Sequence, residues 1–415
     1  MSKWKKTTLG AIASIITGPF GSQLHQSDYV DFGTAVIMPQ NIRDREVDFD
    51  GIAYVNDEDA ERLKRYRVEK SDLVYSRRGD VEKHAFITET LAGALCGTGC
   101  LRVRFNSSAV HPDFISMFLN KPETKKWLTQ NAVGSNMPNL NTEIISAVPI
   151  AYPEKKEQIE ISKILSAIDK KIALNNRIIA ELEAIAKTIY DYWFVQFDFP
   201  NADGKPYRQS GGEMEYNEAL KREIPTGWEA GNLYNIADFV NGLACQKYRP
   251  ADNENGIPVV KIKEMHDGIT SDTELVSENI PEKHKIYRGD ILFSWSATLE
   301  VMLWFGKDSG LNQHIFKVVP KTGFNRAYVF HQLSAYIINF VKMAEARKTT
   351  MGHITTDHLE QSQIALPKQG VLEDFSKLVL PLHERILKSA KENLELTHLR
   401  DWLLPLLMNG QARVD

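Results

Sequence analysis

Two short polar turns in the first third of the chain carry residues that could recognise nucleic-acid bases. The segment YSRRGDVEKH places Arg77, Arg78 and Lys83 in or just after a turn that follows an apolar run. Arginine can bond the O6 and N7 atoms of guanine together, and both arginine and lysine bind phosphates. A solvated basic turn that faces its own acidic residues explains the same pattern, so both interpretations stay open.

The second turn, GSNMPNLN, is rich in asparagine, which can bond two edge atoms of adenine. Asparagine is also a common turn-forming residue, which is the alternative explanation. A third segment, GPFGSQ, would let its backbone approach a phosphate, or is a tight turn. The candidate contacts in these two segments are Ser22, Ser135, Asn136, Asn139 and Asn141.

The asparagine-rich turn has a diverged copy near the end of the chain. Residues 133–153 (VGSNMPNLNTEIISAVPIAYP) match residues 347–367 (RKTTMGHITTDHLEQSQIALP), 214 positions later. The segment DILFSWSA, with Ser294, is in turn the counterpart of DLVYSRRG. The candidate contacts of the second copy are Ser294, Arg347, Lys348, Thr349, Thr350, His353 and Thr355.

The whole chain reads as a tandem repeat. WKKTTLGAIASIITG from Trp4 matches WEAGNLYNIADFVNG from Trp228, at an offset of 224. The offset falls to 218 at KSDLVYSRRG and RGDILFSWSA, and then stays at 214. The early loops of the copies therefore differ in length while the later register persists, as expected for two readers of different sequences held on one shared support.

Composition bounds the class of protein. A chain of 415 residues with 43% hydrophobic and 25% charged residues predicts two or more globular domains. The net charge of −4 argues against an indiscriminate nucleic-acid coat but allows local basic patches. No apolar run approaches the ~20 residues of a membrane helix, and the start lacks a signal peptide. Three cysteines fit a reducing cytosol, and a zinc site is not indicated.

The pattern of elements predicts an α+β fold made of two globular α+β domains and two long helices. Short apolar runs alternate with Gly, Asp and Asn turns, and helices are expected after Pro112 and Asn325. We predict a first domain over residues 1–153, a central helix over 154–199, a linker over 200–224, a second domain over 225–370 and a C-terminal helix over 371–409.

Both long helices have a row of mainly apolar residues at heptad spacing, which we call a heptad seam, and such a seam packs against a partner helix. Because the two seams are repeats of one another, we predict that the helices pair antiparallel in a pseudo-twofold arrangement. Aligning the midpoints of the two seams places Asn175 beside Asn393 and Trp193 beside Phe375. It also places Arg400 beside Ile168, which is unfavourable because a charged side chain then faces an apolar one. The expected interface residues are Leu165, Ile172, Asn175, Ile179, Leu182, Val379, Ile386, Ser389, Asn393 and Leu396.

Catalytic motifs are mostly absent from the sequence. It contains no Walker-type phosphate loop, no G-x-G-x-x-G after a strand and no Asn/Asp-Pro-Pro-aromatic motif. Asp113, Glu123 and Lys125 match a loose nuclease pattern, but Asp113 begins an expected helix rather than lying on a strand. His353 and His358 are five apart without a third ligand and are interpreted as surface residues.

In its order of motifs the chain resembles the specificity subunits of type I restriction-modification systems. The similarity rests on WKKTTLGAI, DLVYSRRG, GSNMPNLNTEIISAVPI, the first heptad helix, DGKPYRQSGGEM, LKREIPTGWE and LRDWLLPLLMNGQ, and it covers nearly the whole chain. The second helix departs from the pattern, because it opens with LPKQGVLEDF where such helices often show Pro-Pro-x-x-Glu-Gln.

This resemblance implies a non-catalytic, cytoplasmic subunit with two target-recognition domains, each reading one half of a bipartite DNA site. The coiled coil would set the spacer and dock two methyltransferase subunits, which would bind S-adenosylmethionine and methylate adenine. Restriction subunits that use ATP and Mg²⁺ would join this assembly, and no cofactor is expected in this chain. The alternatives are a structural adaptor that reads no bases, or an enzyme such as a fused methyltransferase or nuclease.

Overall fold

The structure is a computed structural model that describes residues 4–134, 138–270, 272–296, 298–346, 354 and 356–414, with the backbone alone for 344–346. It divides into two compact units. The first comprises Met1–Lys170 with Thr397–Asp415, and the second comprises Lys171–Leu396. The long helices α5 (Lys155–Tyr190) and α10 (Gln369–Met408) each contribute to both units.

The domain of the first unit contains three small sheets. In spatial order their strands are β1 (Lys5–Thr8) with β10 (Pro149–Tyr152); β2 (Ala13–Thr17), β9 (Cys100–Phe105), β6 (Leu73–Ser76) and β7 (His84–Phe86); and β3 (Tyr29–Val30), β5 (Ala53–Val55), β4 (Thr34–Ile37) and β8 (Leu95–Cys96). The helices are α1 (Asp57–Arg62), α2 (Pro112–Leu119), α3 (Pro122–Asn131) and α4 (Thr142–Ala147), with short 3₁₀ turns η1 (Leu9–Ala11), η2 (Gln26–Asp28), η3 (Pro39–Asn41), η4 (Lys64–Tyr66) and η5 (Glu89–Leu91).

The domain of the second unit repeats this arrangement. Its sheets are β13 (Glu229–Asn232) with β22 (Gln363–Leu366); β14 (Ala237–Asn241), β21 (Ile315–Pro320), β18 (Ile291–Ser294) and β19 (Glu300–Leu303); and β16 (Leu275–Ser277), β15 (Gly256–Val260), β20 (Ser309–Leu311) and β17 (Lys285–Ile286). Its helices are α6 (Leu233–Ile236), α7 (Ile262–Asp267), α8 (Arg326–Ala346) and α9 (Thr356–Glu360), with η7 (Cys245–Lys247) and η8 (Glu282–His284). The copies differ in the third sheet. In the first domain the additional edge strand is β3, which pairs with β5, whereas in the second domain it is β17, which pairs with β20 at the opposite edge.

The central sheet of each domain is buried on both faces because successive strand residues point to opposite sides. In β6, Leu73 and Tyr75 pack into the core that also contains α2, whereas Val74 packs into a core on the other face. In β18, Phe293 and Leu292 divide between two cores in the same way. This two-sided burial explains why these strands read as unbroken apolar runs.

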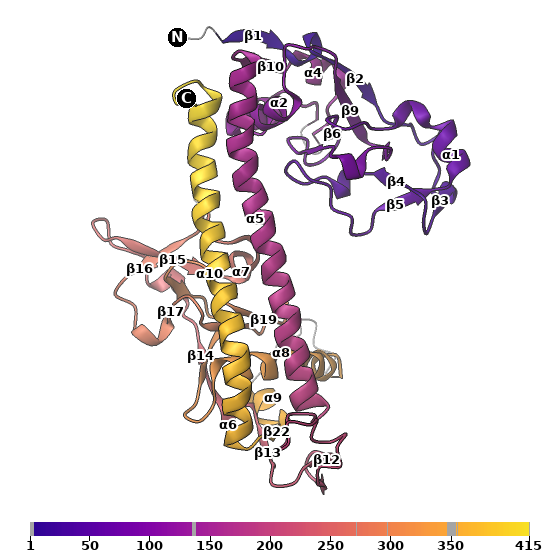
Figure 1. Cartoon of the computed structure of the whole chain (residues 1–415). Helices are drawn as coiled ribbons and strands as arrows, with labels where there is room; N and C mark the ends of the chain where they lie inside the picture. Colours follow the sequence, from indigo (N-terminus) through magenta and orange to yellow (C-terminus); the bar gives the residue numbers. More distant parts are fainter. Residues whose placement is uncertain are drawn as a thin grey trace. The chain divides into compact units, whose positions relative to one another are not determined.

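Helices α5 and α10 lie side by side and antiparallel within each unit (Figure 1). In the second unit, Asn175 Nδ2 donates to Asn393 Oδ1 at 2.9 Å, and the rings of Trp193 and Phe375 are 5.8 Å apart. In the first unit, Leu165 of α5 and Leu407 of α10 share one core. The predicted antiparallel pairing is therefore confirmed. Among the described residues no helix is long and apolar enough to cross a membrane.

The expected interface residues differ in burial. Fully buried are Leu165, Asn175, Val379, Ile386 and Ser389, and half-buried are Ile172, Ile179, Leu182, Asn393 and Leu396. Arg400, the charged residue of the second seam, is half-exposed, and its guanidinium lies 3.4 Å from the carboxylate of Asp169 and 3.0 Å from that of Asp401.

The segment predicted as a linker, residues 200–224, is a folded part of the second unit. It follows a π-helical turn, η6 (Asp191–Val195), and forms most of the hairpin of β11 (Met214–Asn217) and β12 (Arg222–Pro225). The ring of Tyr207 stacks on Phe199 at 4.6 Å, and Phe199 stacks on Trp228 at 5.5 Å. These aromatic contacts attach the segment to the core of the second domain.

Candidate nucleic-acid interface

Four loop segments of the first domain are joined by backbone hydrogen bonds at one end of its central sheet. Gly18, just after β2, donates to the carbonyl of Cys100 at 2.9 Å. Arg77, just after β6, donates to Gly99 at 2.8 Å and accepts from Leu140 at 2.9 Å. These contacts gather residues 18–23, 77–80, 97–99 and 138–141, which we call the first loop cluster. They bring the basic turn and the asparagine-rich turn together, although the two are about 60 residues apart in sequence.

The second domain repeats this backbone pattern. Gly242 donates to the carbonyl of Ile315 at 3.1 Å. Trp295 donates to His314 at 3.4 Å and accepts from Ile354 at 3.0 Å. We call residues 242–245, 295–296, 312–314 and 354 the second loop cluster. The same main-chain framework therefore carries an arginine at position 77 and a tryptophan at the equivalent position 295.

The side chains of the first loop cluster are partly engaged with one another. Arg77 Nε donates to Asn139 Oδ1 at 3.2 Å, whereas the side chain of Arg78 is exposed. Lys83 donates to Asp80 at 2.6 Å, and this hydrogen bond raises the pKa of the lysine. Lys83 fits the interpretation as a basic turn paired with its own acidic residues. Arg78 is exposed and fits the interpretation as a nucleic-acid contact.

Two other candidates of the first domain lie at its surface. Asn141 caps α4 with its side-chain oxygen, which accepts from the backbone of Ile144 at 2.8 Å. That oxygen is therefore used for folding, in agreement with the turn-forming alternative. Ser22 lies in an exposed turn, in which Gln23 donates its backbone N–H to the carbonyl of Phe20 at 2.8 Å.

The prediction for Ser294 as a surface contact is wrong. Ser294 is fully buried, and its hydroxyl donates to the carbonyl of Ser296 at 3.3 Å. Its counterpart Ser76 is also buried and donates to the carbonyl of Arg78 at 2.6 Å. In both copies this serine fixes the turn after the strand, because a buried hydroxyl needs a partner inside the fold.

Several candidates lie outside the residues that the structure describes. They are Ser135, Asn136, Arg347, Lys348, Thr349, Thr350, His353 and Thr355. The neighbouring His358, interpreted from sequence as a surface residue, is instead buried in α9 with 2% of its surface exposed. That correction follows from the packing of α9, whose residue Leu359 belongs to the main core of the second unit.

The second loop cluster contains polar and aromatic residues that the sequence did not single out. The indole of Trp295 lies 5.6 Å from the ring of His314 and donates through Nε1 to Asn241 Oδ1 at 3.3 Å. The amide of Gln313 lies 3.4 Å from Nε2 of His314. The sequence could have indicated Trp295 as a candidate, because the alignment of the two copies at an offset of 218 places it at the position of Arg77.

The first glycine of GPFGSQ serves packing inside the domain. A Cβ at Gly18 would lie 2.1 Å from the carbonyl oxygen of Gly97, and a Cβ at the equivalent Gly242 would lie 2.1 Å from that of Asn312. Both glycines let two loop backbones touch, so this close approach is to protein rather than phosphate. A Cβ at Gly21 would meet nothing within 4 Å.

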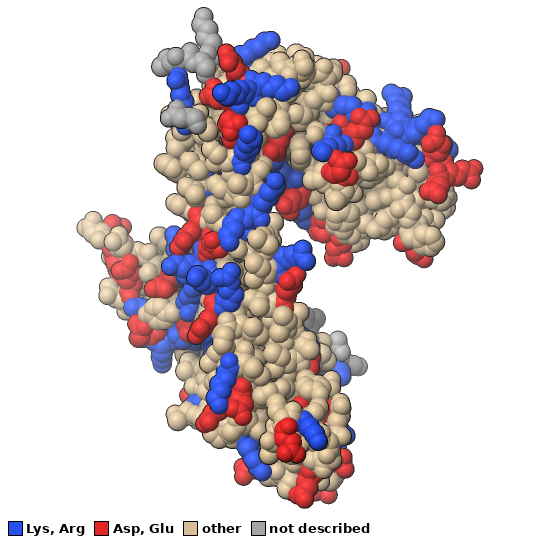
Figure 2. Space-filling view, viewed as in Figure 1, with Lys and Arg blue, Asp and Glu red and all other residues tan. Residues whose placement is uncertain are grey.

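Basic and acidic side chains are interspersed on the face of the molecule drawn in Figure 2, where Lys and Arg lie in small groups next to Asp and Glu. In the first unit a cavity of about 560 Å³ is lined by Lys64, Arg65, Arg67, Lys70, Arg102 and Arg104. Arg104 pairs with Asp72 at 2.7 Å, and Lys70 pairs with Glu89 at 2.7 Å. These two ion pairs, together with the bonds of the Arg102 guanidinium to the carbonyls of Arg65 and Arg67, hold the segment before β6 in place.

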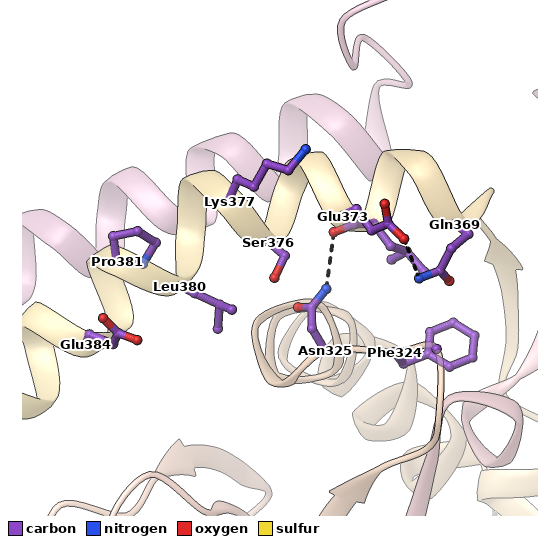
Figure 3. A pocket seen from close by; sticks show the side chains of 11 residues that line it. Phe324, Asn325, Gln369, Glu373, Ser376, Lys377, Leu380, Pro381 and Glu384 are labelled. Atoms are coloured by element: carbon purple, nitrogen blue, oxygen red, sulfur yellow. Dashed lines mark hydrogen bonds between the residues drawn. The ribbon is translucent and has the colours of Figure 1, made fainter.

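A second cavity of about 560 Å³ lies beside the first turns of α10 in the second unit (Figure 3). It is lined by the loop that precedes α8 and by one face of α10. Asn325 Nδ2 donates to the carbonyl of Leu372 at 3.2 Å at its edge. Among the described residues, no cluster of three His, Cys, Asp or Glu could hold a metal ion.

Two copies of one α+β domain, each with a loop cluster and each packed on an antiparallel helix pair, define a tandem-repeat protein. A family model described as the type I restriction modification DNA specificity domain matches residues 1–184 and 225–387. The chain therefore belongs to this family, whose members are specificity subunits, while the catalytic activities of type I systems lie in other subunits.

Individual relatives agree with this assignment. The chain is 24% identical to the specificity subunit of the type I restriction enzyme HindI from Haemophilus influenzae, over 99% of this chain and 100% of the relative. It is 27% identical to the MjaIX specificity subunit from Methanocaldococcus jannaschii, over 72% of this chain and 68% of that one. The crystal structure of a type I S subunit from M. genitalium has the same fold, with a TM-score of 0.60, 14% identity and 98% and 96% coverage.

Proposed function

We propose that each loop cluster of this chain reads one half of a bipartite DNA site. The observation that carries the proposal is the repeated hydrogen-bond framework, in which Leu140 bonds to Arg77 and Ile354 bonds to Trp295. A shared framework with different side chains suits two readers of different sequences on the same kind of duplex. In the first cluster, the exposed Arg78 is the best candidate for a bidentate contact to guanine.

We further propose that α5 and α10 set the spacer and dock two methyltransferase subunits. Support comes from large apolar side chains that remain exposed on both helices at repeat-equivalent positions. Ile164 of α5 corresponds to Leu378 of α10, and Ile185 corresponds to Leu399, each 214 positions apart. Single exposed apolar residues are common on protein surfaces, so the support lies in their recurrence at equivalent positions of both helices.

The remaining parts of the proposal concern the partners. Methyltransferase subunits would bind S-adenosylmethionine, and restriction subunits would use ATP and Mg²⁺, in the cytoplasm of the host cell. This chain would then contribute sequence recognition and assembly only. Its near-neutral charge suits such a division of labour, because partner subunits can supply much of the phosphate contact.

The test is single-molecule methylome sequencing of cells that express this chain together with its methyltransferase partner. We expect a bipartite motif, methylated on adenine, that is absent when the methyltransferase is expressed alone. Arg78→Ala should relax the preference in one half-site by about tenfold at a single base pair, since a bidentate contact contributes about 1–3 kcal/mol of discrimination.

The matched control is Arg65→Ala, which removes an exposed arginine of the same domain that lies outside the first loop cluster and outside both long helices. It should leave both half-sites unchanged. A stable complex with the methyltransferase that produces no motif would contradict base reading and favour the structural adaptor. Altered preference in both half-sites of Arg78→Ala would contradict the modular assignment of one domain to one half-site.

A further inference from the structure

One arginine of the first unit joins the recognition domain to both long helices. Arg45 lies in the loop between β4 and β5, where its backbone N–H donates to His84 at 2.8 Å and its carbonyl accepts from Phe86 at 3.2 Å. Its φ of +64° lies in the left-handed region, which is unusual for a residue with a side chain. The surrounding fold therefore holds this arginine in a strained conformation.

The guanidinium of Arg45 is bonded at all three nitrogens. Nε donates to Ser116 Oγ at 3.1 Å, and a second nitrogen donates to Asp113 of α2. The third donates to Asp169 of α5 at 3.0 Å. The side chain is only 15% exposed, so these charge-assisted bonds are poorly screened by solvent.

The network continues from Asp113 and Asp169 to the helices. Asp113 also accepts from Ser166 of α5 at 2.8 Å. The other oxygen of Asp169 lies 3.4 Å from Arg400 of α10. We call Arg45, Asp113, Ser116, Asp169 and Arg400 the Arg45 cluster. It ties a loop of the domain to α2, α5 and α10, all within the first unit.

The second unit has no equivalent ionic network among its described residues. The positions 214 residues after Asp113 and Asp169 are Ala327 and His383. His383 is buried and lies 3.1 Å from the buried His331, Nε2 to Nε2. His331 in turn stacks on Tyr190 of α5 at 5.7 Å. In the second unit the contact at this position is therefore between neutral aromatic rings, whereas in the first unit it is a directional ion pair between Arg45 and Asp169.

We infer that Arg45 is a positioning residue, which fixes the orientation of the first recognition domain on the helix pair and so makes recognition strict in spacer length. This inference rests on the proposed function. A planar guanidinium bonded directly to α2 and α5, and through Asp169 to Arg400 of α10, resists rotation, since each bond has a preferred direction. Without it the apolar packing keeps the domain attached but constrains its orientation less, so sites with a shorter or longer spacer become acceptable.

The experiment measures adenine methylation by the complete complex with its methyltransferase partner. The substrates are duplexes that carry the native half-sites with the native spacer, and with spacers one base pair shorter or longer. We expect Asp169→Asn and Arg45→Met to reduce the ratio of native to altered-spacer rates about tenfold, because small misplacements cost rate steeply. The base preference within each half-site should remain as in the native protein.

Two further variants separate positioning from general stability. Arg104→Met removes another partly buried arginine, 28% exposed, whose ion pairs with Glu69 and Asp72 stay inside the domain. It should keep the spacer preference. Arg45→Lys keeps the charge but loses the planar fork, and should restore the preference only in part. If Arg45→Met is unfolded, Asp169→Asn and Arg45→Lys decide the matter.

Unchanged spacer preference in folded Asp169→Asn and Arg45→Lys complexes would overturn the inference. Equal loss of spacer preference in Arg104→Met would overturn it too, because general loosening would then be the cause. Failure of the proposed function would look different, since the native complex itself would then methylate no bipartite site.

Discussion

The two units attach the same domain to the same kind of helix pair through different chemistry. In the first, Gln158 of α5 is fully buried and its amide donates to the carbonyls of Ala109 and Pro153 at 3.0 and 2.9 Å. Its oxygen accepts from the backbone of His111 at 2.7 Å. In the second, the equivalent residue is Leu372, and a cavity remains open beside it (Figure 3).

The contact between domain and helix pair is also more aromatic in the second unit than in the first. In the second unit, Phe375 lies 4.9 Å from Phe194 and 6.3 Å from Tyr190, ring to ring. The equivalent of Phe375 in the first unit is Ile161, which packs with Leu407 and Met408. The repeat therefore preserves which positions are buried, while the chemistry at those positions has diverged toward polar bonds in one unit and aromatic packing in the other.

The largest expected effect comes from truncating the aromatic attachment. Trp193→Ala should lower the free energy of unfolding of the second unit by about 3–5 kcal/mol, and the equivalent Leu407→Ala should cost the first unit less, toward the lower end of about 2–5 kcal/mol. The reason is the larger buried area of Trp193, which is 5% exposed and contacts Phe375. Urea unfolding of both variants measures the difference. A larger loss in Leu407→Ala would break the comparison.

An intermediate effect is expected where the copies are alike. Gly18→Ala and Gly242→Ala should each cost about 2 kcal/mol, because the new Cβ meets a backbone carbonyl at 2.1 Å in both domains. Gly21→Ala, whose Cβ meets nothing, is the control and should change stability by less than about 0.5 kcal/mol. Thermal unfolding gives all three values. A cost confined to one copy would show that the shared loop framework is not equally tight.

The smallest effect is a difference in pH dependence. Burial lowers the pKa of His331 to about 3 and that of His383 to about 4, and the nearby Lys187 and Arg326 act in the same direction. The ordinary value is 6.5, so above that pH the full stability is present. Below it the unfolded chain takes up protons that the folded unit excludes, and stability falls until about pH 4–3.

Each histidine contributes about 1.4 kcal/mol per pH unit within this window. The first unit has His84, whose pKa burial lowers to about 3. We therefore expect His331 and His383 together to cost the second unit about twice as much stability between pH 6.5 and 5.5 as His84 costs the first unit. Hydrogen exchange resolved by unit measures this, and replacing both His331 and His383 with Gln should remove the excess. An unchanged pH dependence of the second unit in this double variant would contradict the neutral histidine contact.

Periodicity and self-similarity were enough to predict the repeat, the strands, the long helices and their antiparallel pairing. The heptad seams located Asn175 and Asn393 correctly as neighbours, because the spacing of apolar residues on a helix defines its buried stripe. The apolar runs likewise predicted strands. These features depend on residues close in sequence, or on a comparison of the chain with itself.

Partners distant in sequence were not predictable in the same way. Ser294 looked like an exposed turn residue, but it is the last residue of β18, which is buried along its whole length between β21 and β19. Asn141 looked available for base contacts, yet its oxygen caps α4. Trp295 and His314 were passed over because nothing local marks two loops that meet only through the sheet.

The sequence by itself determined the α+β repeat, its two helices and its place in a family, because these rest on local periodicity and on the match between copies. Only the tertiary structure decided which side chains remain available and how each domain is attached. Arg45 shows the reason, because its partners lie 68 and 124 residues away and become neighbours only when the domain and helices pack. Burial and pairing of polar groups arise from such long-range contacts, which local patterns do not encode.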